Sequence, residues 1–298
     1  MAFNLYFAGS RFDGDKYILK NKACRLFSFA NERKEIKEYA TYEERGTLLV
    51  DSGAFSIYHS GAKIDIDEYI QFINDNPRIE HFIELDVIPY PVLDYNTAEK
   101  SAQGSWENYL YMIERVNDWE KILPVYHFGE DVKYFKRILE FTHEGKHIPY
   151  ICVGGRHGVS TLQQEEYFNN LFTIIKESSN PNVKVHVLGM TVLSLLEKYP
   201  FYSADSTSYL MQAIYGTIMT RFGPVNVSSG NKGKNNFIFL TDVEKKEVLD
   251  EIKRFGYTLE DLQETYTSRI EFNIDYCLNW ARNYEYKPKI AKKASLFG

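Results

Sequence analysis

The chain alternates short apolar runs with longer amphipathic segments. Eight of the runs are typical of β-strands: FNLYFAG, RLFSFA, TLLVDSG, HFIELDV, ILPVYHF, IPYICVGG, VKVHVLG and FYSADS. The spacers include DIDEYIQFINDN, SWENYLYMIERVND, DVKYFKRILEFTHEG and LQQEEYFNNLFTIIKESS, whose apolar residues recur as on one face of a helix. Because the strands are almost continuously apolar, we expect a parallel sheet covered by helices. Repeated βα units predict a (βα)8 barrel, with an open doubly wound sheet as the alternative.

This alternation ends at residue 206, and the rest of the chain, 206–298, has a mostly helical pattern. STSYLMQAIYGTIMTRF predicts a helix, and a polar stretch containing glycines follows it. Thr241 with Glu244, and Thr258 with Asp261, match the capping box that begins a helix. No stretch resembling a linker divides the chain. We therefore expect residues 1–298 to form one α/β domain, with 206–298 packed on the barrel as an extension.

The composition is that of a globular protein. No apolar run is long enough to span a membrane, and the first residues lack the features of a signal peptide, so a cytoplasmic protein is expected. Cys24, Cys152 and Cys277 lie far apart and form neither a zinc ribbon nor a disulfide framework.

Net charge excludes a uniformly basic surface, because the chain carries −6 at neutral pH. A local basic patch is still allowed. Two stretches are candidates for it, RFGPVNVSSGNKGKNNF and the tail KPKIAKK, and both can also be ordinary solvated segments.

Polar residues gather where the apolar runs end. In barrel enzymes the reacting groups lie at the carboxyl ends of the strands, around one mouth. The residues at these ends are Asp51, Ser52, Gly53, Glu84, Asp86, His127, Gly154, Gly155, Gly189 and Asp205. Each alone has a structural explanation, since DSG forms turns, an aspartate can cap a helix or a proline turn, and a buried histidine is often structural.

Three aspartates from three strands change this interpretation. Asp51, Asp86 and Asp205 would face one mouth, and desolvated carboxylates repel one another, so a site that keeps them has a use for them. N-glycosidic chemistry is one such use. One carboxylate traps or stabilises the sugar cation, a second moves a proton, and a third accepts hydrogen bonds from a guanine-like base.

The order of these motifs resembles the tRNA-guanine transglycosylase superfamily, and most closely its branch that places 7-deazaguanines in DNA. That family has a DSGGFQ-like motif, an aspartate followed by a proline turn, a glycine pair, an LMG-like strand end and a last strand that ends in the nucleophilic aspartate. The corresponding stretches here are DSGAFS, ELDVIPYP, YICVGG, HVLGMT and YSADSTS. They cover the whole expected barrel.

Carried over by position, the resemblance implies that Asp205 is the nucleophile, that Asp51 is the acid/base and that Asp86 binds the edge of the base. Further base-binding residues are expected among the other strand-end positions, namely Ser52, Gly154, Gly155, Gly189 and His127. Contacts to nucleic acid are expected from four cations, Arg156, Arg221, Lys232 and Lys234.

The sequence also departs from the family. The tRNA enzymes hold a structural zinc with a cysteine cluster and a histidine near the C-terminus, whereas this tail has only Cys277 and no histidine after His186. The segment after Asp205 lacks the family's MPTR-like continuation. We therefore expect no zinc subdomain, no metal or redox cofactor, and DNA rather than tRNA as the substrate.

The expected reaction is exchange of guanine for a free 7-deazaguanine such as preQ0, in DNA with a flipped base or in single-stranded DNA, within a bacterial or phage-infected cell. Four alternatives stay open: a DNA glycosylase that leaves an abasic site in phage defence or repair, a tRNA-guanine transglycosylase, an O-glycoside hydrolase, and a catalytically inert nucleic-acid-binding homologue. A further candidate partner is a sliding clamp, because KKASLFG resembles clamp-binding peptides through Ser295, Leu296 and Phe297.

Overall fold

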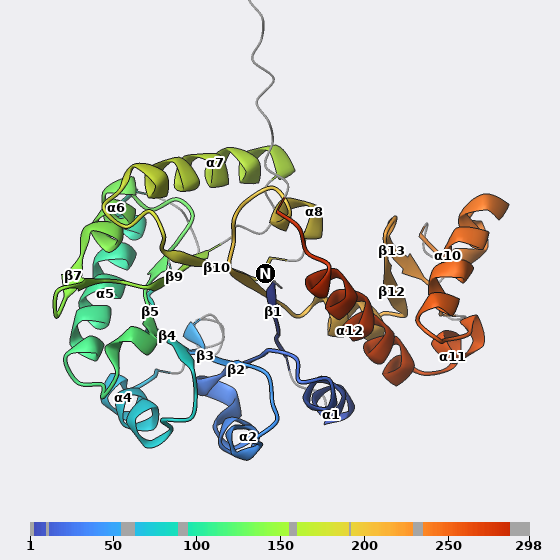
Figure 1. Ribbon diagram of the computed structural model, residues 1–298, viewed down its shortest axis with the longest axis horizontal. Coiled ribbons are helices and arrows are strands. Elements are labelled where there is room, and N and C mark those ends of the chain that lie inside the picture. Colours follow the sequence, from blue (N-terminus) through green and yellow to red (C-terminus); the bar gives the residue numbers. More distant parts are fainter. Residues whose placement is uncertain are drawn as a thin grey trace, which may run out of the picture.

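A nine-stranded parallel sheet forms the centre of the protein (Figure 1). The computed structural model describes residues 3–9, 12–54, 63–88, 95–154, 160–190, 192–228 and 235–286. The strands of this sheet are β1 (Asn4–Phe7), β2 (Arg25–Ser28), β3 (Leu48–Asp51), β4 (His81–Ile83), β5 (Ile122–Leu123), β6 (Val125–Tyr126), β9 (Tyr150–Gly154), β10 (Lys184–Leu188) and β11 (Ser203–Ser206). They correspond to the eight apolar runs, with one run supplying both β5 and β6.

The sheet is nearly closed into a barrel. Its strand order is β5-β4-β3-β2-β1-β11-β10-β9-β6, so the strands at the two ends of the order are separated in the chain by Pro124 alone. Proline has no N–H to donate to a strand ladder, which explains the interruption. The carbonyl of Pro124 still accepts the N–H of Cys152 at 2.8 Å. The expectation of a barrel-like parallel sheet is thus confirmed.

Helices surround this sheet on the outside (Figure 1). They are α1 (Phe12–Lys20), α2 (Phe29–Thr41), α4 (Ile66–Asp75), α5 (Tyr95–Ile113), α6 (Val132–Glu140), α7 (Thr161–Glu177) and α8 (Leu193–Leu196). A 3-10 turn (Trp119–Lys121) precedes β5, and a small antiparallel pair, β7 (Thr142–His143) and β8 (Lys146–His147), follows α6.

Side chains alternate along each strand between two cores. Those pointing inward fill the barrel, and the cluster they form includes Tyr6, Leu26, Leu49, Val125 and Cys152. Those pointing outward pack against the helices in a larger apolar core. Because Asp51 follows Leu49 by two residues, the alternation of a strand places it on the inward side, at the carboxyl end of β3.

The extension contains both helices and a hairpin. Its elements are α9 (Ser208–Ile214), β12 (Thr217–Thr220), β13 (Gly223–Asn226), a 3-10 turn (Phe237–Phe239), α10 (Asp242–Arg254), α11 (Leu259–Glu264) and α12 (Tyr266–Arg282). Helix α12 packs on the barrel, where the ring of Trp280 meets that of Phe3 edge-on at 5.2 Å. Figure 1 shows α10, β12 and β13 on the other side of α12 from the barrel, where a second small core forms around Ile218 and Phe272.

The hairpin corrects one sequence-based expectation. A helix was expected through STSYLMQAIYGTIMTRF and a polar loop after it, but α9 ends at Ile214 and the chain turns back as β12 and β13. Gly216 is the cause, because its φ of +82° is rarely adopted by other residues and a Cβ there would lie 2.3 Å from Oγ of Ser228. The two capping boxes expected at Thr241 and Thr258 are both present.

Within the described residues, none of the helices combines the length and the apolar character that a membrane span requires.

Candidate active site at the carboxyl ends of the strands

Asp51 is the last residue of β3, and a tight turn follows it. The N–H of Gly53 donates to Oδ2 of Asp51 at 3.2 Å. Gly53 has φ of +90°, and a Cβ at this position would lie 2.5 Å from both the Cβ of Ala30 and Oγ of Ser28. Only glycine therefore fits this turn, and the turn in return fixes the carboxyl group of Asp51.

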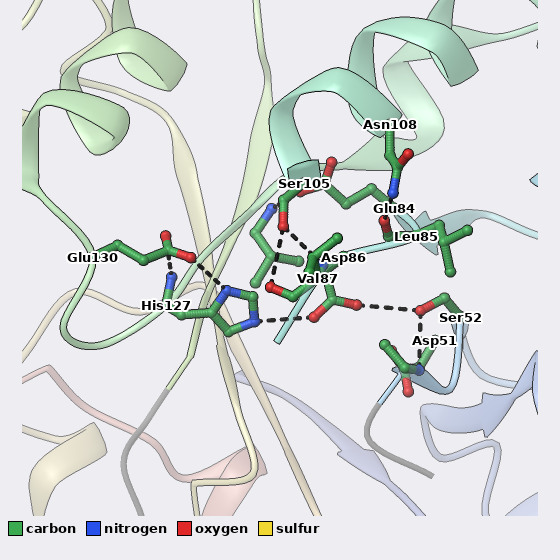
Figure 2. Close-up of polar contacts among 12 residues, drawn as sticks. Asp51, Ser52, Glu84, Leu85, Asp86, Val87, Ser105, Asn108, His127 and Glu130 are labelled. Atoms are coloured by element: carbon green, nitrogen blue, oxygen red, sulfur yellow. Dashed lines mark hydrogen bonds and ion pairs between the residues drawn. The ribbon is translucent and has the colours of Figure 1, made fainter. Parts of the chain in front are cut away.

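Ser52 lies between the strand and the turn and is completely buried. Its hydroxyl donates to Oδ1 of Asp86 at 3.2 Å, which joins the carboxyl ends of β3 and β4 (Figure 2). Ser52 and Asp86, both expected to bind the base, are thus in contact with each other, while their binding to a base stays a prediction.

His127 bridges two acidic side chains, as Figure 2 shows. Its Nε2 lies 3.0 Å from Oδ2 of Asp86, and its Nδ1 lies 3.0 Å from Oε1 of Glu130. The backbone N–H of His127 also donates to Oε2 of Glu130 at 3.0 Å. Both ring nitrogens of His127 are therefore engaged, and the contact it makes at the mouth is to Asp86.

The two carboxylates change the protonation of this histidine. Burial opposes a charged imidazolium, but the hydrogen bonds and charges of Asp86 and Glu130 together outweigh it and raise the pKa of His127 to about 10. At neutral pH the ring is cationic and donates from both nitrogens. One positive charge is thus held between two acidic groups beside the mouth.

Glu84 lies behind Asp86 and is fully buried. Its Oε1 accepts the N–H of Val125 at 2.7 Å, while Oε2 has no hydrogen-bond partner among the described residues. Burial raises the pKa of Glu84 well above its usual range, which favours the uncharged form of its carboxyl group.

Asp205 lies on β11 opposite Tyr6 of β1 and is mostly buried. Its Oδ1 accepts two hydrogen bonds, from the N–H of Gly189 at 2.8 Å and from Nε2 of His186 at 3.1 Å. Gly189 has φ of +61°, which turns the chain after β10 and aims this N–H at the carboxylate. None of the hydrogen bonds in the described part of the chain engages the other oxygen, Oδ2.

His186 was not singled out by the sequence interpretation. It is completely buried, and its Nδ1 lies 2.5 Å from Oγ of Ser203, which in turn contacts the hydroxyl of Tyr150. The signal in VKVHVLG was weak, because Lys184 lies two residues before His186 on the same side of the strand and makes a second polar residue there unremarkable. Glu130 was also missed, three residues after His127 in a turn.

The three aspartates interact through their charges. Burial, and then the charges of Asp86 and Asp205, raise the pKa of Asp51 to about 8. The same carboxylates, with burial as the larger cause, raise the pKa of the buried Cys152 well above its usual range. Asp51 is consequently protonated for most of the time at neutral pH. The site therefore holds a proton donor that feels the charge of Asp205, whose Oδ2 takes part in no hydrogen bond among the described residues.

Gly154 ends β9 next to His127. A Cβ on Gly154 would lie 3.2 Å from Cδ2 of His127, so this glycine leaves room for the imidazole. Gly155, Arg156, Lys232 and Lys234 were expected to bind base or nucleic acid, and the tail of Ser295, Leu296 and Phe297 to bind a clamp. All seven lie outside the described residues.

Arg221 lies in the turn between β12 and β13, where it pairs with Glu247 of α10. Strand β12 of the hairpin packs on α9 and α12. Among the described residues the ion pair of Arg221 is thus with α10 of the extension and not with one of the three aspartates.

Neither cysteine chemistry nor metal ligation is prominent here. Cys24, Cys152 and Cys277 are free thiols. The described residues contain no group of three or more histidine, cysteine, aspartate or glutamate side chains that could hold a metal ion. The described strand-end residues include acids and one histidine cation, which can transfer protons and form hydrogen bonds.

The chain matches no protein-family model and no curated protein. The case for its function consequently depends on the arrangement of Asp51, Asp86, Asp205 and their hydrogen-bonding partners.

Proposed function

We propose that the protein is a DNA-guanine transglycosylase that exchanges guanine for a 7-deazaguanine base through a covalent glycosyl-enzyme. One observation carries the proposal: the charge of Asp205 contributes to raising the pKa of Asp51 to about 8, and no hydrogen bond among the described residues engages Oδ2 of Asp205. Protonated acid and free carboxylate are the two groups that a retaining exchange at an anomeric carbon needs. The barrel-like parallel sheet supports the proposal, because counting β5 and β6 as one interrupted strand would make it a (βα)8 barrel, and enzymes of that fold react at the carboxyl ends of the strands.

In the first half of this reaction, Oδ2 of Asp205 attacks C1′ of the flipped nucleotide. The bond from C1′ to N9 breaks, its electron pair goes to the base, and Asp51 gives the base its proton. Guanine leaves. The negative charge of Asp51 then lies next to the incoming base.

In the second half, the carboxylate of Asp51 takes the N9 proton of a free 7-deazaguanine such as preQ0. The N9 electron pair attacks C1′, and the bond to Asp205 breaks, which restores the carboxylate. Two displacements give net retention. Asp86 accepts hydrogen bonds from the N–H groups of the base, while Ser52 and His127 hold Asp86 in place.

The test is incorporation of labelled 7-deazaguanine into DNA by the full chain. Incorporation is expected for the natural protein, with a DNA adduct on Asp205 that survives denaturation. Asp205→Asn should abolish both, whereas Asp250→Asn on the exposed side of α10 should leave both unchanged. Activity undiminished in Asp205→Asn would overturn the assignment. If abasic sites form in DNA when no free base is added, the protein is a DNA glycosylase and not a transglycosylase. If the label enters tRNA alone, the substrate is tRNA and not DNA.

A further inference from the structure

A chain of buried polar groups runs through the barrel interior to Asp205. It begins at the hydroxyl of Tyr150 on β9, passes through Oγ of Ser203 on β11 and reaches the imidazole of His186 on β10. Nε2 of His186 then contacts Oδ1 of Asp205 at 3.1 Å. Ser203 and His186 have no exposed surface, and Tyr150 has almost none. Such groups are costly to bury unless each is hydrogen-bonded, so the direction of each bond can be derived.

Counting protons gives that direction. In the described structure the hydroxyl of Tyr150 has one hydrogen-bond partner, Ser203, so its proton is satisfied only if Tyr150 donates. Ser203 then accepts that bond and gives its own proton to Nδ1 of His186, 2.5 Å away. Nδ1 is thus an acceptor, which leaves the proton of a neutral imidazole on Nε2. This N–H points at Oδ1 of Asp205, and every donor in the chain has an acceptor.

The reverse direction fails this count. If His186 donated from Nδ1 to Ser203, one hydroxyl proton would be buried without an acceptor. It would be that of Tyr150 if Ser203 donates to Tyr150, or that of Ser203 if Ser203 accepts from both neighbours. A buried hydroxyl left in this state costs about 1–3 kcal/mol.

The bond from His186 decides which oxygen of Asp205 is free. Gly189 and His186 both donate to Oδ1, one from the backbone after β10 and the other from the middle of that strand. Two donors on one oxygen fix the carboxylate plane, and within the described part of the chain no donor engages Oδ2. The ring of His186 is itself held, because Tyr6 meets it edge-on at 5.7 Å.

We propose that His186 is a positioning residue for the nucleophile, held as the Nε2–H tautomer by Tyr150 and Ser203 so that Oδ2 of Asp205 faces the anomeric carbon. The role of Asp205 as nucleophile rests on the proposed function, whereas the tautomer of His186 does not depend on it. A misplaced nucleophile slows the chemical step more than it weakens binding, and displacement by about 1 Å can cost about 100-fold in rate.

The first experiment needs no activity. Two-bond ¹H–¹⁵N correlation spectra of the full chain, labelled on histidine, report which ring nitrogen of His186 carries the proton. We expect a neutral ring protonated on Nε2 at pH 7, and a loss of this single tautomer in Ser203→Ala. A proton on Nδ1, alone or in a doubly protonated ring, would overturn the inference whether or not the protein exchanges bases.

The second experiment measures kcat and KM for base exchange. His186→Leu should lower kcat about 100-fold with little change in KM. His186→Gln keeps an N–H donor near the position of Nε2, so its kcat should be at least about tenfold higher than that of His186→Leu. His147→Leu removes a histidine bonded to the carbonyl of Phe141 outside the barrel and should leave kcat unchanged. Full kcat in His186→Leu, or equal losses in the Leu and Gln variants, would show that His186 does not position Asp205.

The two results separate the two proposals. If the natural protein exchanges no base but the spectra show the Nε2–H tautomer, the proposed function fails and the hydrogen-bond chain stands. If it exchanges bases and His186→Leu does so equally well, the proposed function stands and the positioning role fails.

Discussion

The hydroxyl of Ser52 donates to Oδ1 of Asp86 at 3.2 Å and thereby links the carboxyl ends of two neighbouring strands. Asp86 accepts a second bond from His127, so its two oxygens are held from two sides. A carboxylate fixed in this way presents its remaining acceptor directions to the mouth without the entropy loss of orienting a free side chain.

Removal of the Ser52 hydroxyl should weaken base binding. Ser52→Ala takes one donor from Asp86, and a hydrogen bond to a charged group contributes about 1.5 kcal/mol, so KM for the free base should rise about tenfold. Ser178→Ala, which removes a hydroxyl at the end of α7, is the matched control. Unchanged KM in Ser52→Ala would mean that Asp86 is held well enough by His127 alone.

The rate of base exchange should fall in alkaline solution. Asp51 must give up a proton in the first half of the reaction, and its pKa of about 8 means that the protonated form is lost as the pH rises through that value. A plot of log(kcat/KM) against pH should decline above pH 8 with a slope of about −1, because one proton is lost. A profile that stays level to pH 10 would remove Asp51 from the role of acid.

Asp51 should also make the fold less stable at high pH. Its pKa rises from an ordinary 3.8 to about 8 on folding, so the folded state holds more protons between these values and the free energy of unfolding decreases as the pH rises from 4 to 8. Asp51→Asn removes the charge. We expect it to stabilise the protein on the order of 1–3 kcal/mol at pH 9 and by less at pH 5, measured by urea unfolding. An equal change at both pH values would contradict the raised pKa.

Glu130 should control the charge of His127. Its carboxylate and that of Asp86 raise the pKa of His127 to about 10, so Glu130→Gln should lower this pKa, as measured by NMR titration of the ring. The folded pKa lies above the usual 6.5, so the stability contributed by His127 is complete below pH 6.5 and is lost as the pH rises to 10. Glu130→Gln should therefore destabilise more at pH 6 than at pH 10.5. Glu140→Gln, exposed on α6, should not move the titration.

Gly53 should tolerate no side chain. Gly53→Ala combines a positive φ with a Cβ that would lie 2.5 Å from Ala30 and Ser28, and we expect a loss on the order of 2–3 kcal/mol in unfolding free energy. Gly256→Ala is a matched control, because Gly256 has a similar φ of +83° but nothing within 4 Å of its Cβ position. Gly256→Ala should therefore lower the free energy of unfolding by less than Gly53→Ala does. Equal losses would show that the contact with Ala30 is relieved by a small shift.

Local sequence patterns determined much of the fold. The apolar runs predicted the strands, and the capping pairs at Thr241 and Thr258 predicted two helix starts, because both signals act between residues near one another in the chain. The hairpin after α9 was not anticipated, since β12 and β13 are short and depend on Gly216 and on packing against α12. The β-branched side chains of Thr217, Ile218 and Thr220 favour a strand, so the helix expected through TIMT also ran against local propensity.

The same division holds for the candidate site. From the sequence, the strand-end positions of Asp51, Asp86 and Asp205 already indicated that they would face one mouth, because parallel strands share their carboxyl edge. Only the tertiary structure decided how each acid is held and charged. The imidazolium of His127 between Asp86 and Glu130, the raised pKa of Asp51 and the bond from His186 to Asp205 all join residues distant in sequence or depend on burial. Desolvation and through-space charge arise from packing and therefore leave no local sequence pattern.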